Sequence, residues 1–315
     1  MIACRTLLVW LLLSNAAMAQ HLWQKPKPLK AKSEVSRIIG PLSMTQPAKP
    51  IHIVWVWGFD KWHRPGAHDY ERVRDLMTGL LAKVPKVTVE AAYEFPSKAL
   101  FEKADLVCMY LHLPQLSAAQ FADFQAFIEG GGAVVSLHET CIIRPSGEGL
   151  KLAHCLGRAW NEGKSKWGAI FADLTVDNSH EVFRGFPEKL PVVDEFYWGL
   201  HQKQEGVDIL ATVPVGPARN SKGPIPQERL SEKQWPVVWT HEMGKGRVFA
   251  TSTGHNTFTY YDPEFRIILF RGMAWALKQK ADPFMPLVFK GITNAGHMVG
   301  TTDTMRDWKG KRRGK

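Results

Sequence analysis

The sequence predicts an α/β fold with a mostly parallel, doubly wound sheet. Two observations in residues 51–137 carry this prediction: short β-rich apolar runs alternate with amphipathic helical segments, and the turns between them are short. A third observation is that strand-like segments dominate after residue 169. The chain has 315 residues and is 45% hydrophobic, which is enough for a sizeable core and excludes a wholly disordered protein.

Four β-rich apolar runs justify the parallel part of the predicted sheet. The first, residues 51–57, reads Ile-His-Ile-Val-Trp-Val-Trp and ends at Gly58. Its short, continuously apolar character is typical of a strand that is buried on both faces. Further strands are expected at residues 86–91, 104–113 and 133–137.

Two amphipathic helices separate these strands. Residues 68–83 carry apolar side chains at helical spacing, and residues 118–129 place three phenylalanines and an isoleucine on one face. Ser117 is suited to cap the second helix, and the glycine triplet 130–132 is suited to end it. Alternation of this kind predicts helices on both faces of the sheet.

The second half of the chain lacks this alternation. Five strand-like segments follow one another with few helical patterns between them, which predicts extra antiparallel strands. These segments are residues 169–176, 191–195, 207–213, 236–241 and 246–252. A polar loop is expected at residues 214–235, and a helix at residues 263–278 closes the domain.

The two ends of the chain differ in composition from the middle. Arg5 precedes a short apolar run, and Ala17-Met18-Ala19 is suited to cleavage by signal peptidase, so we expect an exported protein, periplasmic or secreted. The predicted divisions are a signal peptide at 1–19, an exposed basic Pro/Lys-rich linker at 20–50, a folded domain at 51–291 and a basic flexible tail at 292–315.

The formal net charge of +10 is concentrated at these ends. Residues 20–50 and 306–315 carry +5 each and Arg5 adds one, so residues 51–305 carry −1. A nucleic-acid-binding fold concentrates Lys and Arg on its folded surface, so we expect no nucleic-acid partner. The basic ends could make weak contacts with an anionic surface, or could serve only solubility.

Four sequence blocks, in order along the chain, carry a resemblance to a known family. They are Gly130-Gly131-Gly132-Ala133-Val134-Val135-Ser136-Leu137-His138, residues 191–197 (Pro-Val-Val-Asp-Glu-Phe-Tyr), residues 239–248 (Trp-Thr-His-Glu-Met-Gly-Lys-Gly-Arg-Val), and Gly254-His255-Asn256 with residues 262–266 and Trp275-Ala276. Together they resemble the trehalose-utilisation ThuA-like family over about residues 51–280. The resemblance implies a class I glutamine-amidotransferase-like fold, a flavodoxin-like three-layer architecture, and a role in carbohydrate catabolism.

One departure argues against glutamine amidotransferase activity. In true amidotransferases of this fold, the nucleophilic cysteine lies at the turn where this chain has His138 and Glu139, and an imidazole does not replace a thiolate. Cys141 is not expected to act as a displaced nucleophile, and a disulfide between Cys141 and Cys155 stays open. Ser136 and Glu139 also differ from the family's usual residues. Glu139 could orient the site histidine, raise its pKa, or point away.

Ligands of open α/β sheets bind where the carboxyl ends of the strands meet. His138 and His255 each follow a predicted strand and Glu195 ends another, and the resemblance places these three in one pocket. The predicted catalytic residues are His138, Glu195, His255 and Glu139. The predicted substrate-binding residues are Tyr197, Asn256, His68, Trp62 and Trp198.

Two chemistries remain open for this set of residues. Imidazole titrates near neutral pH and suits general acid–base catalysis. Alternatively, His138, Glu195 and His255 could be metal ligands, since two histidines and a carboxylate can leave an open position on Zn²⁺ or a similar ion. The sequence requires no cofactor, leaves a divalent metal open, and has no loop that fits a nucleotide cofactor.

Two functional hypotheses follow. The first is an exported enzyme that acts on a sugar or an oxidised (keto) glycoside as an isomerase, lyase or hydrolase. A positioned base could remove the acidic C–H proton next to the substrate's carbonyl group. The second is a non-catalytic glycan-binding module on the same fold. In both, the expected partner is a small carbohydrate.

Overall fold

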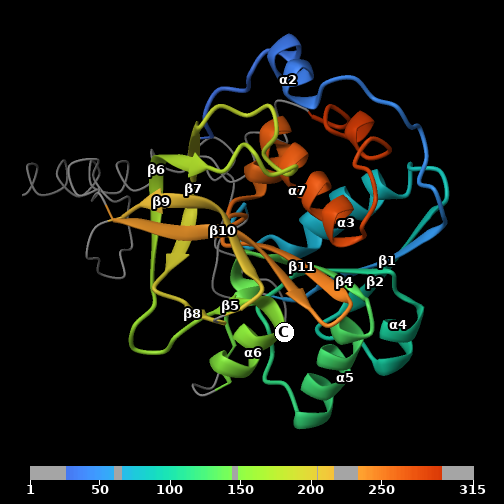
Figure 1. Ribbon diagram of the computed structural model, residues 1–315, viewed down its shortest axis with the longest axis vertical. Helices are drawn as coiled ribbons and strands as arrows, with labels where there is room; N and C mark the ends of the chain where they lie inside the picture. Colours follow the sequence, from blue (N-terminus) through green and yellow to red (C-terminus); the bar gives the residue numbers. More distant parts are fainter. Residues whose placement is uncertain (1–25, 60–65, 144–147, 204, 216–232, 293–315) are drawn as a thin grey trace, which may run out of the picture.

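The computed structural model describes residues 26–59, 66–143, 148–203, 205–215 and 233–292 (Figure 1). The predicted signal peptide and nearly all of the predicted basic tail lie outside these residues. Within the described residues, none of the helices combines the length and apolarity needed to cross a membrane.

A nine-stranded sheet with the strand order β2-β1-β3-β4-β11-β10-β9-β6-β7 forms the centre of the described structure. Five strands are parallel: β2 (Val87–Tyr93), β1 (Ile51–Trp57), β3 (Leu106–Tyr110), β4 (Ala133–Leu137) and β11 (Gly246–Thr251). Four strands extend the sheet in antiparallel pairing: β10 (Gln234–Met243), β9 (Val207–Pro214), β6 (Lys166–Val176) and β7 (Lys189–Trp198). The predicted fold class, with extra antiparallel strands in the second half, is therefore confirmed.

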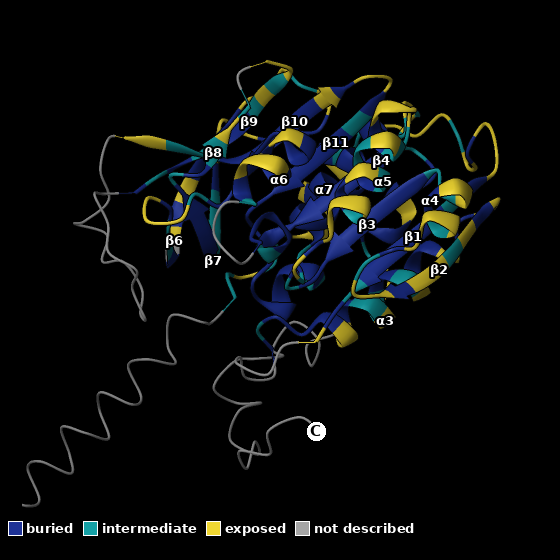
Figure 2. Ribbon diagram, turned by 90° about the horizontal axis from the view of Figure 1, so that it is seen from below, coloured by how far each residue is buried: buried dark blue, intermediate teal, exposed yellow. Residues whose placement is uncertain are grey.

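Helices cover both faces of the parallel part of the sheet (Figure 1). One face holds α2 (Lys32–Ile39), α3 (Tyr70–Leu81) and α7 (Pro263–Ala276), and the other holds α4 (Lys98–Lys103), α5 (Ala118–Glu129) and α6 (Gly149–Leu156). Because side chains alternate along a strand, β1 sends Ile53 and Trp55 into the first core and Val54 and Val56 into the second. In Figure 2, β1 and β3 are dark blue along most of their length, whereas α4, α5 and the edge strand β2 carry exposed residues.

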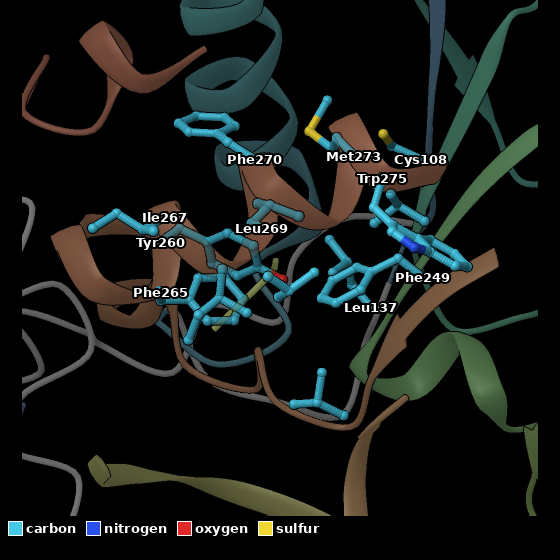
Figure 3. Close-up of a cluster of buried hydrophobic side chains, with 14 of the residues drawn as sticks. Cys108, Leu137, Phe249, Tyr260, Phe265, Ile267, Leu269, Phe270, Met273 and Trp275 are labelled. Atoms are coloured by element: carbon cyan, nitrogen blue, oxygen red, sulfur yellow. The ribbon is translucent and has the colours of Figure 1, made fainter. Parts of the chain in front are cut away.

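Buried hydrophobic side chains of α7 pack against the first face of the sheet (Figure 3). Phe270 and Met273 are fully buried, and both belong to the same cluster as Leu137 of β4 and Phe249 of β11. Gly272 of α7 lies directly against Phe249: a Cβ atom at this position would come 2.4 Å from the Phe249 ring. The helix therefore packs closely on the two strands whose carboxyl ends carry the predicted site.

Most element predictions match the structure within a few residues, and α5 and β4 match at both ends. The N-cap predicted at Ser117 is confirmed, since its side chain accepts a hydrogen bond from the Gln120 amide, and the Gln120 side chain completes a capping box. Elements that the sequence analysis did not predict are the short helices α4 and α6, the small sheet of β5 (Arg158–Ala159) and β8 (His201–Gln202), and the 3₁₀ turns His138–Cys141, Thr257–Tyr261 and Met285–Leu287.

The prediction of an exposed linker at residues 20–50 is wrong for the part that the structure describes. Helix α2 buries Val35 and Ile38, and the Arg271 guanidinium donates to the Ile38 carbonyl at 2.7 Å. Lys27 and Lys30 form ion pairs with Glu264, a carboxylate that is 2% exposed. The Pro- and Lys-rich composition of segment 26–50 predicts a linker. The prediction fails because the contacts that order this segment join it to residues more than 200 positions away in the sequence.

Candidate functional site

The carboxyl ends of β4 and β11 bring two histidines together. His138 follows β4 and begins a 3₁₀ turn, and His255 lies four residues after β11. His138 and His68 both have positive φ angles, 50° and 48°, which are uncommon for residues other than glycine and often mark functional sites. Gly254, at φ 119°, has no room for a Cβ atom, which would lie 2.7 Å from the Tyr260 hydroxyl.

Three imidazole rings and one carboxylate converge on a single buried point. His68 Nε2 lies 2.9 Å from His255 Nδ1 and 3.0 Å from His138 Nε2. Glu195 Oε1 lies 3.7 Å from His138 Nε2 and 3.5 Å from His255 Nδ1. The four ligand atoms lie within 4.8 Å of one another, and all four residues are buried. We call His68, His138, Glu195 and His255 the His₃Glu cluster.

Hydrogen bonds outside the cluster orient two of its rings. The Nδ1 atom of His138 lies 2.7 Å from the Ser252 carbonyl, which can only accept, so Nδ1 carries the proton. The Nδ1 atom of His68 lies 2.6 Å from Glu139 Oε2, which favours the same tautomer. In their neutral forms, both rings therefore direct an unprotonated Nε2 into the cluster. This arrangement is typical of metal-ligating histidines.

Several atoms that can accept a hydrogen bond converge at the centre of the cluster. His138 Nε2 has one lone pair and faces His68 Nε2 at 3.0 Å, His255 Nδ1 at 3.3 Å and the Tyr197 hydroxyl at 2.8 Å. A proton shared among the rings or a cation among them would relieve the repulsion between facing lone pairs. Three imidazole nitrogens and a carboxylate oxygen are a donor set that suits Zn²⁺ and similar ions.

Glu139 contacts His68 rather than its neighbour His138. Its carboxylate lies 2.5 Å from the Tyr70 hydroxyl and 2.8 Å from His112 Nδ1. Burial alone would raise the pKa of Glu139, but the charges and hydrogen bonds of His68 and His112 outweigh it and hold that pKa well below its usual value. Glu139, predicted as catalytic, is thus placed to position His68.

Glu195 and Asp194 are successive buried carboxylates with different surroundings. Burial raises the pKa of Glu195 to about 8, because the carboxylate form is desolvated. A cation at the cluster would favour the ionised form. Burial also raises the pKa of Asp194, to about 6, although it accepts from the Glu195, Gly254 and His255 amides and the Thr259 hydroxyl. Asp194 therefore holds the loop that carries His255.

The other predicted substrate-binding residues have different placements. The Tyr197 hydroxyl contacts the cluster at His138 Nε2, and His68 is one of the cluster's members. Asn256 is buried, with its amide 3.4 Å from Asp194 Oδ1. Trp198 is not brought to the site: it belongs to the α7-side core, whereas Tyr197 belongs to the opposite core. Trp62 lies outside the described residues.

Two residues of the site were not predicted from the sequence. His112 lies just beyond the carboxyl end of β3, but the predicted strand at residues 104–113 extends past it, so the strand-end signal that identifies His138 does not identify His112. Tyr70 was assigned to the apolar face of helix 68–83, and its hydroxyl contact to Glu139 has no local sequence signal.

The cysteines contribute no nucleophile among the described residues. Cys141 is 1% exposed, and burial raises its pKa to about 12, so the reactive thiolate is scarce at neutral pH. Cys108, Cys141 and Cys155 are all free, which settles the disulfide question that the sequence left open.

An open α/β sheet with helices on both faces and a polar cluster at the carboxyl edge of its parallel part is consistent with the glutamine amidotransferase-like fold that the sequence blocks imply. A sequence model described as "ThuA: Trehalose utilisation" matches residues 54–276. The chain therefore belongs to the ThuA family, as the sequence blocks had predicted. The family's description indicates carbohydrate catabolism.

Two solved structures share this fold with low sequence identity. A ThuA-like protein of Parabacteroides merdae is 19% identical, with a TM-score of 0.57 over 73% of this chain and 90% of its own. A ThuA-like protein of Bacteroides uniformis is 16% identical, with a TM-score of 0.58 over 76% of this chain and 97% of its own. No curated protein matches the chain.

Proposed function

We propose that this protein is a metal-dependent enzyme of carbohydrate catabolism that acts on a sugar or keto-glycoside. The observation that carries the proposal is the His₃Glu cluster, in which the Nε2 atoms of two imidazoles lie 3.0 Å apart while their Nδ1 atoms face a carbonyl and a carboxylate. Family membership supports the substrate class, since the family is described by trehalose utilisation.

His68, His138, His255 and Glu195 would hold the metal. A bound divalent cation supplies Lewis acidity toward a carbonyl or hydroxyl oxygen of the substrate. Glu139 and the Ser252 carbonyl keep the Nδ1 protons of His68 and His138 in place, so that these rings present Nε2 to the cluster. Burial of the four side chains excludes water and strengthens their electrostatic interactions.

Tyr197 is the candidate for proton transfer within the site. Its hydroxyl lies 2.8 Å from His138 Nε2, and its ring stacks on the His138 ring with the centroids 4.5 Å apart. Burial raises the pKa of Tyr197 well above its usual value, so the hydroxyl keeps its proton at neutral pH and would act as a general acid toward the carbonyl oxygen of a keto-glycoside. Isomerisation, elimination and hydrolysis are the reaction types that such a step serves.

The first test is the metal content of the purified protein. We expect about one equivalent of a divalent transition metal per chain in the wild type and loss of most of it in His138→Ala, because that substitution removes a ligand. The matched control is His52→Ala: His52 lies outside the cluster, with Nε2 3.4 Å from Glu90. A wild-type protein that neither contains nor takes up metal would refute the metal-dependent mechanism and favour metal-free acid–base catalysis.

The second test is turnover of oxidised and unoxidised disaccharides, followed by mass spectrometry. The proposal expects product from the keto form with metal-loaded wild type, and none with His138→Ala of unchanged circular dichroism. Saccharide binding without turnover would instead support the glycan-binding module.

We also propose export, on the basis of the apolar run and the Ala17-Met18-Ala19 site. The mature protein would begin near Gln20, and mass spectrometry of protein from the cell envelope tests this. Lys27 and Lys30 are engaged by Glu264, so any anionic-surface contact would depend on the other basic residues of the two ends.

A further inference from the structure

The face of the β6–β7 hairpin that carries Glu195 extends beyond the cluster to residues that have no role in the site described above. In the regular antiparallel ladder of β6 and β7, Tyr197 lies opposite Trp167, Glu195 opposite Ala169 and Val193 opposite Phe171. Because side chains alternate along a strand, these residues all belong to one face of the β6–β7 hairpin. Val193 and Phe171 are thus the next residues on the face that presents Glu195 to the cluster.

Along this face the side chains change from buried to exposed. Glu195 is 7% exposed and Ala169 is 1% exposed, whereas Phe171 is 58% exposed. Asp173, the next residue of this face on β6, is exposed as well. A large aromatic ring and a carboxylate therefore lie side by side in solvent, starting two strand positions, or about 7 Å, from the level of Glu195.

We propose that Phe171 is a substrate-binding residue that stacks on the sugar unit next to the reacting one, with Val193 beside it and Asp173 accepting from sugar hydroxyls. This inference rests on the proposed function, because it takes the reacting unit to lie at the His₃Glu cluster. It makes the preferred substrate a disaccharide or longer glycoside rather than a single sugar.

The chemistry of the surface fits a saccharide. A sugar ring has an apolar C–H face that packs on an aromatic ring and a rim of hydroxyls that donate to carboxylates. The two strand positions that separate Phe171 from the level of Glu195 would let one unit lie beside the cluster while the next contacts Phe171. A single exposed aromatic residue is also a smaller apolar surface than a stable protein interface requires.

The test compares trehalose and glucose binding to the metal-loaded, full-length protein by isothermal titration calorimetry. We expect the wild type to prefer trehalose, and Phe171→Ala to lose about threefold to tenfold in trehalose affinity with little change for glucose. Phe171→Tyr keeps an aromatic ring and should keep the preference. The matched control is Tyr93→Ala, an aromatic residue 52% exposed on β2, at the far edge of the sheet.

The proposal is overturned if the wild type shows no preference for trehalose, or if Phe171→Ala keeps the wild-type affinity ratio. It is also overturned if Phe171→Ala changes only the mass in solution, measured by light scattering, because the ring would then cover a second copy of the chain. Metal content is measured in the same samples. A metal-free wild type whose trehalose preference is lost in Phe171→Ala would refute the proposed metal chemistry and leave this inference standing.

Discussion

The two faces of strand β7 give neighbouring carboxylates opposite roles. Asp194 is 1% exposed and accepts from four donors within 3.0 Å, three of them backbone amides. Glu195 is 7% exposed and faces His138 and His255 at 3.7 and 3.5 Å, without a comparable set of donors. The hydrogen-bonding capacity of Asp194 is thus filled by donors of the fold, whereas Glu195 faces two imidazoles of the cluster.

The difference shows that two successive residues of one strand can have a structural role and a functional role, because their side chains point to opposite faces of the sheet. Hydrogen bonds lower the pKa of Asp194 against the effect of burial, so it reaches only about 6, whereas that of Glu195 reaches about 8. A buried carboxylate that is costly to ionise becomes useful where a cation or a proton arrives. Changes at the two positions should therefore have different consequences.

Asp194→Ala should have the largest effect, a loss of about 3–5 kcal/mol in the free energy of unfolding, because several buried donors lose their acceptor. Urea denaturation measures this loss. Asp173→Ala, at an exposed carboxylate of the same hairpin, is the control and should stay near the wild type. If both variants unfolded alike, the supporting role of Asp194 would be refuted.

Glu195→Gln should separate stability from metal binding. The raised pKa of Glu195 means that the folded state favours the protonated form, so its contribution to stability is present below pH 4.5 and is lost as the pH rises toward 8. Gln has no such dependence. We expect metal-free Glu195→Gln to match the wild type near pH 4 and to exceed it by about 2–4 kcal/mol near pH 8.

The same variant should bind metal more weakly, because the ligand oxygen has lost its charge. Thermal denaturation at several pH values and metal titration measure the two quantities on one preparation. A wild type whose stability does not fall over this pH range, relative to Glu195→Gln, would contradict the account of Glu195.

Glu139→Gln should have the smallest effect on the site, a 10- to 100-fold loss in metal affinity, since outer carboxylates of metal-bound histidines contribute on the order of this factor. Competition with a chelator measures it. Glu90→Gln, which changes the surface carboxylate 3.4 Å from His52, should leave the affinity unchanged. Equal affinities in all three proteins would show that Glu139 does not orient His68.

Sequence patterns predicted the elements with strong local signals. Strand β4 and helix α5 were predicted at their observed limits, because an apolar run, a capping serine and a glycine triplet are all local. Helices α4 and α6, with six and eight residues, are too short for a periodic pattern to be convincing. Segment 26–50 was assigned wrongly because its partners, Glu264 and Arg271, are remote in sequence.

The site was only partly predictable for the same reason. Strand ends and the family blocks identified His138, Glu195 and His255, which belong to the cluster, and Tyr197, which contacts it. His68 was assigned to substrate, since nothing in its neighbourhood shows that its ring lies 3.0 Å from that of His138. The direction of Glu139 depends on Tyr70 and His112, which approach it from two other elements.

By itself, the sequence determined the α/β class, the family and the edge of the sheet at which chemistry is expected, because these follow from local periodicity and from residues directly after strands. Only the tertiary structure decided which side chains meet. It placed Glu139 against His68 and gave Asp194 and Glu195 their separate environments. Distances, burial and hydrogen-bond partners arise from contacts between segments that are remote in the sequence. Because side chains alternate between the two faces of β7, Asp194 and Glu195 meet different remote residues and therefore have different roles.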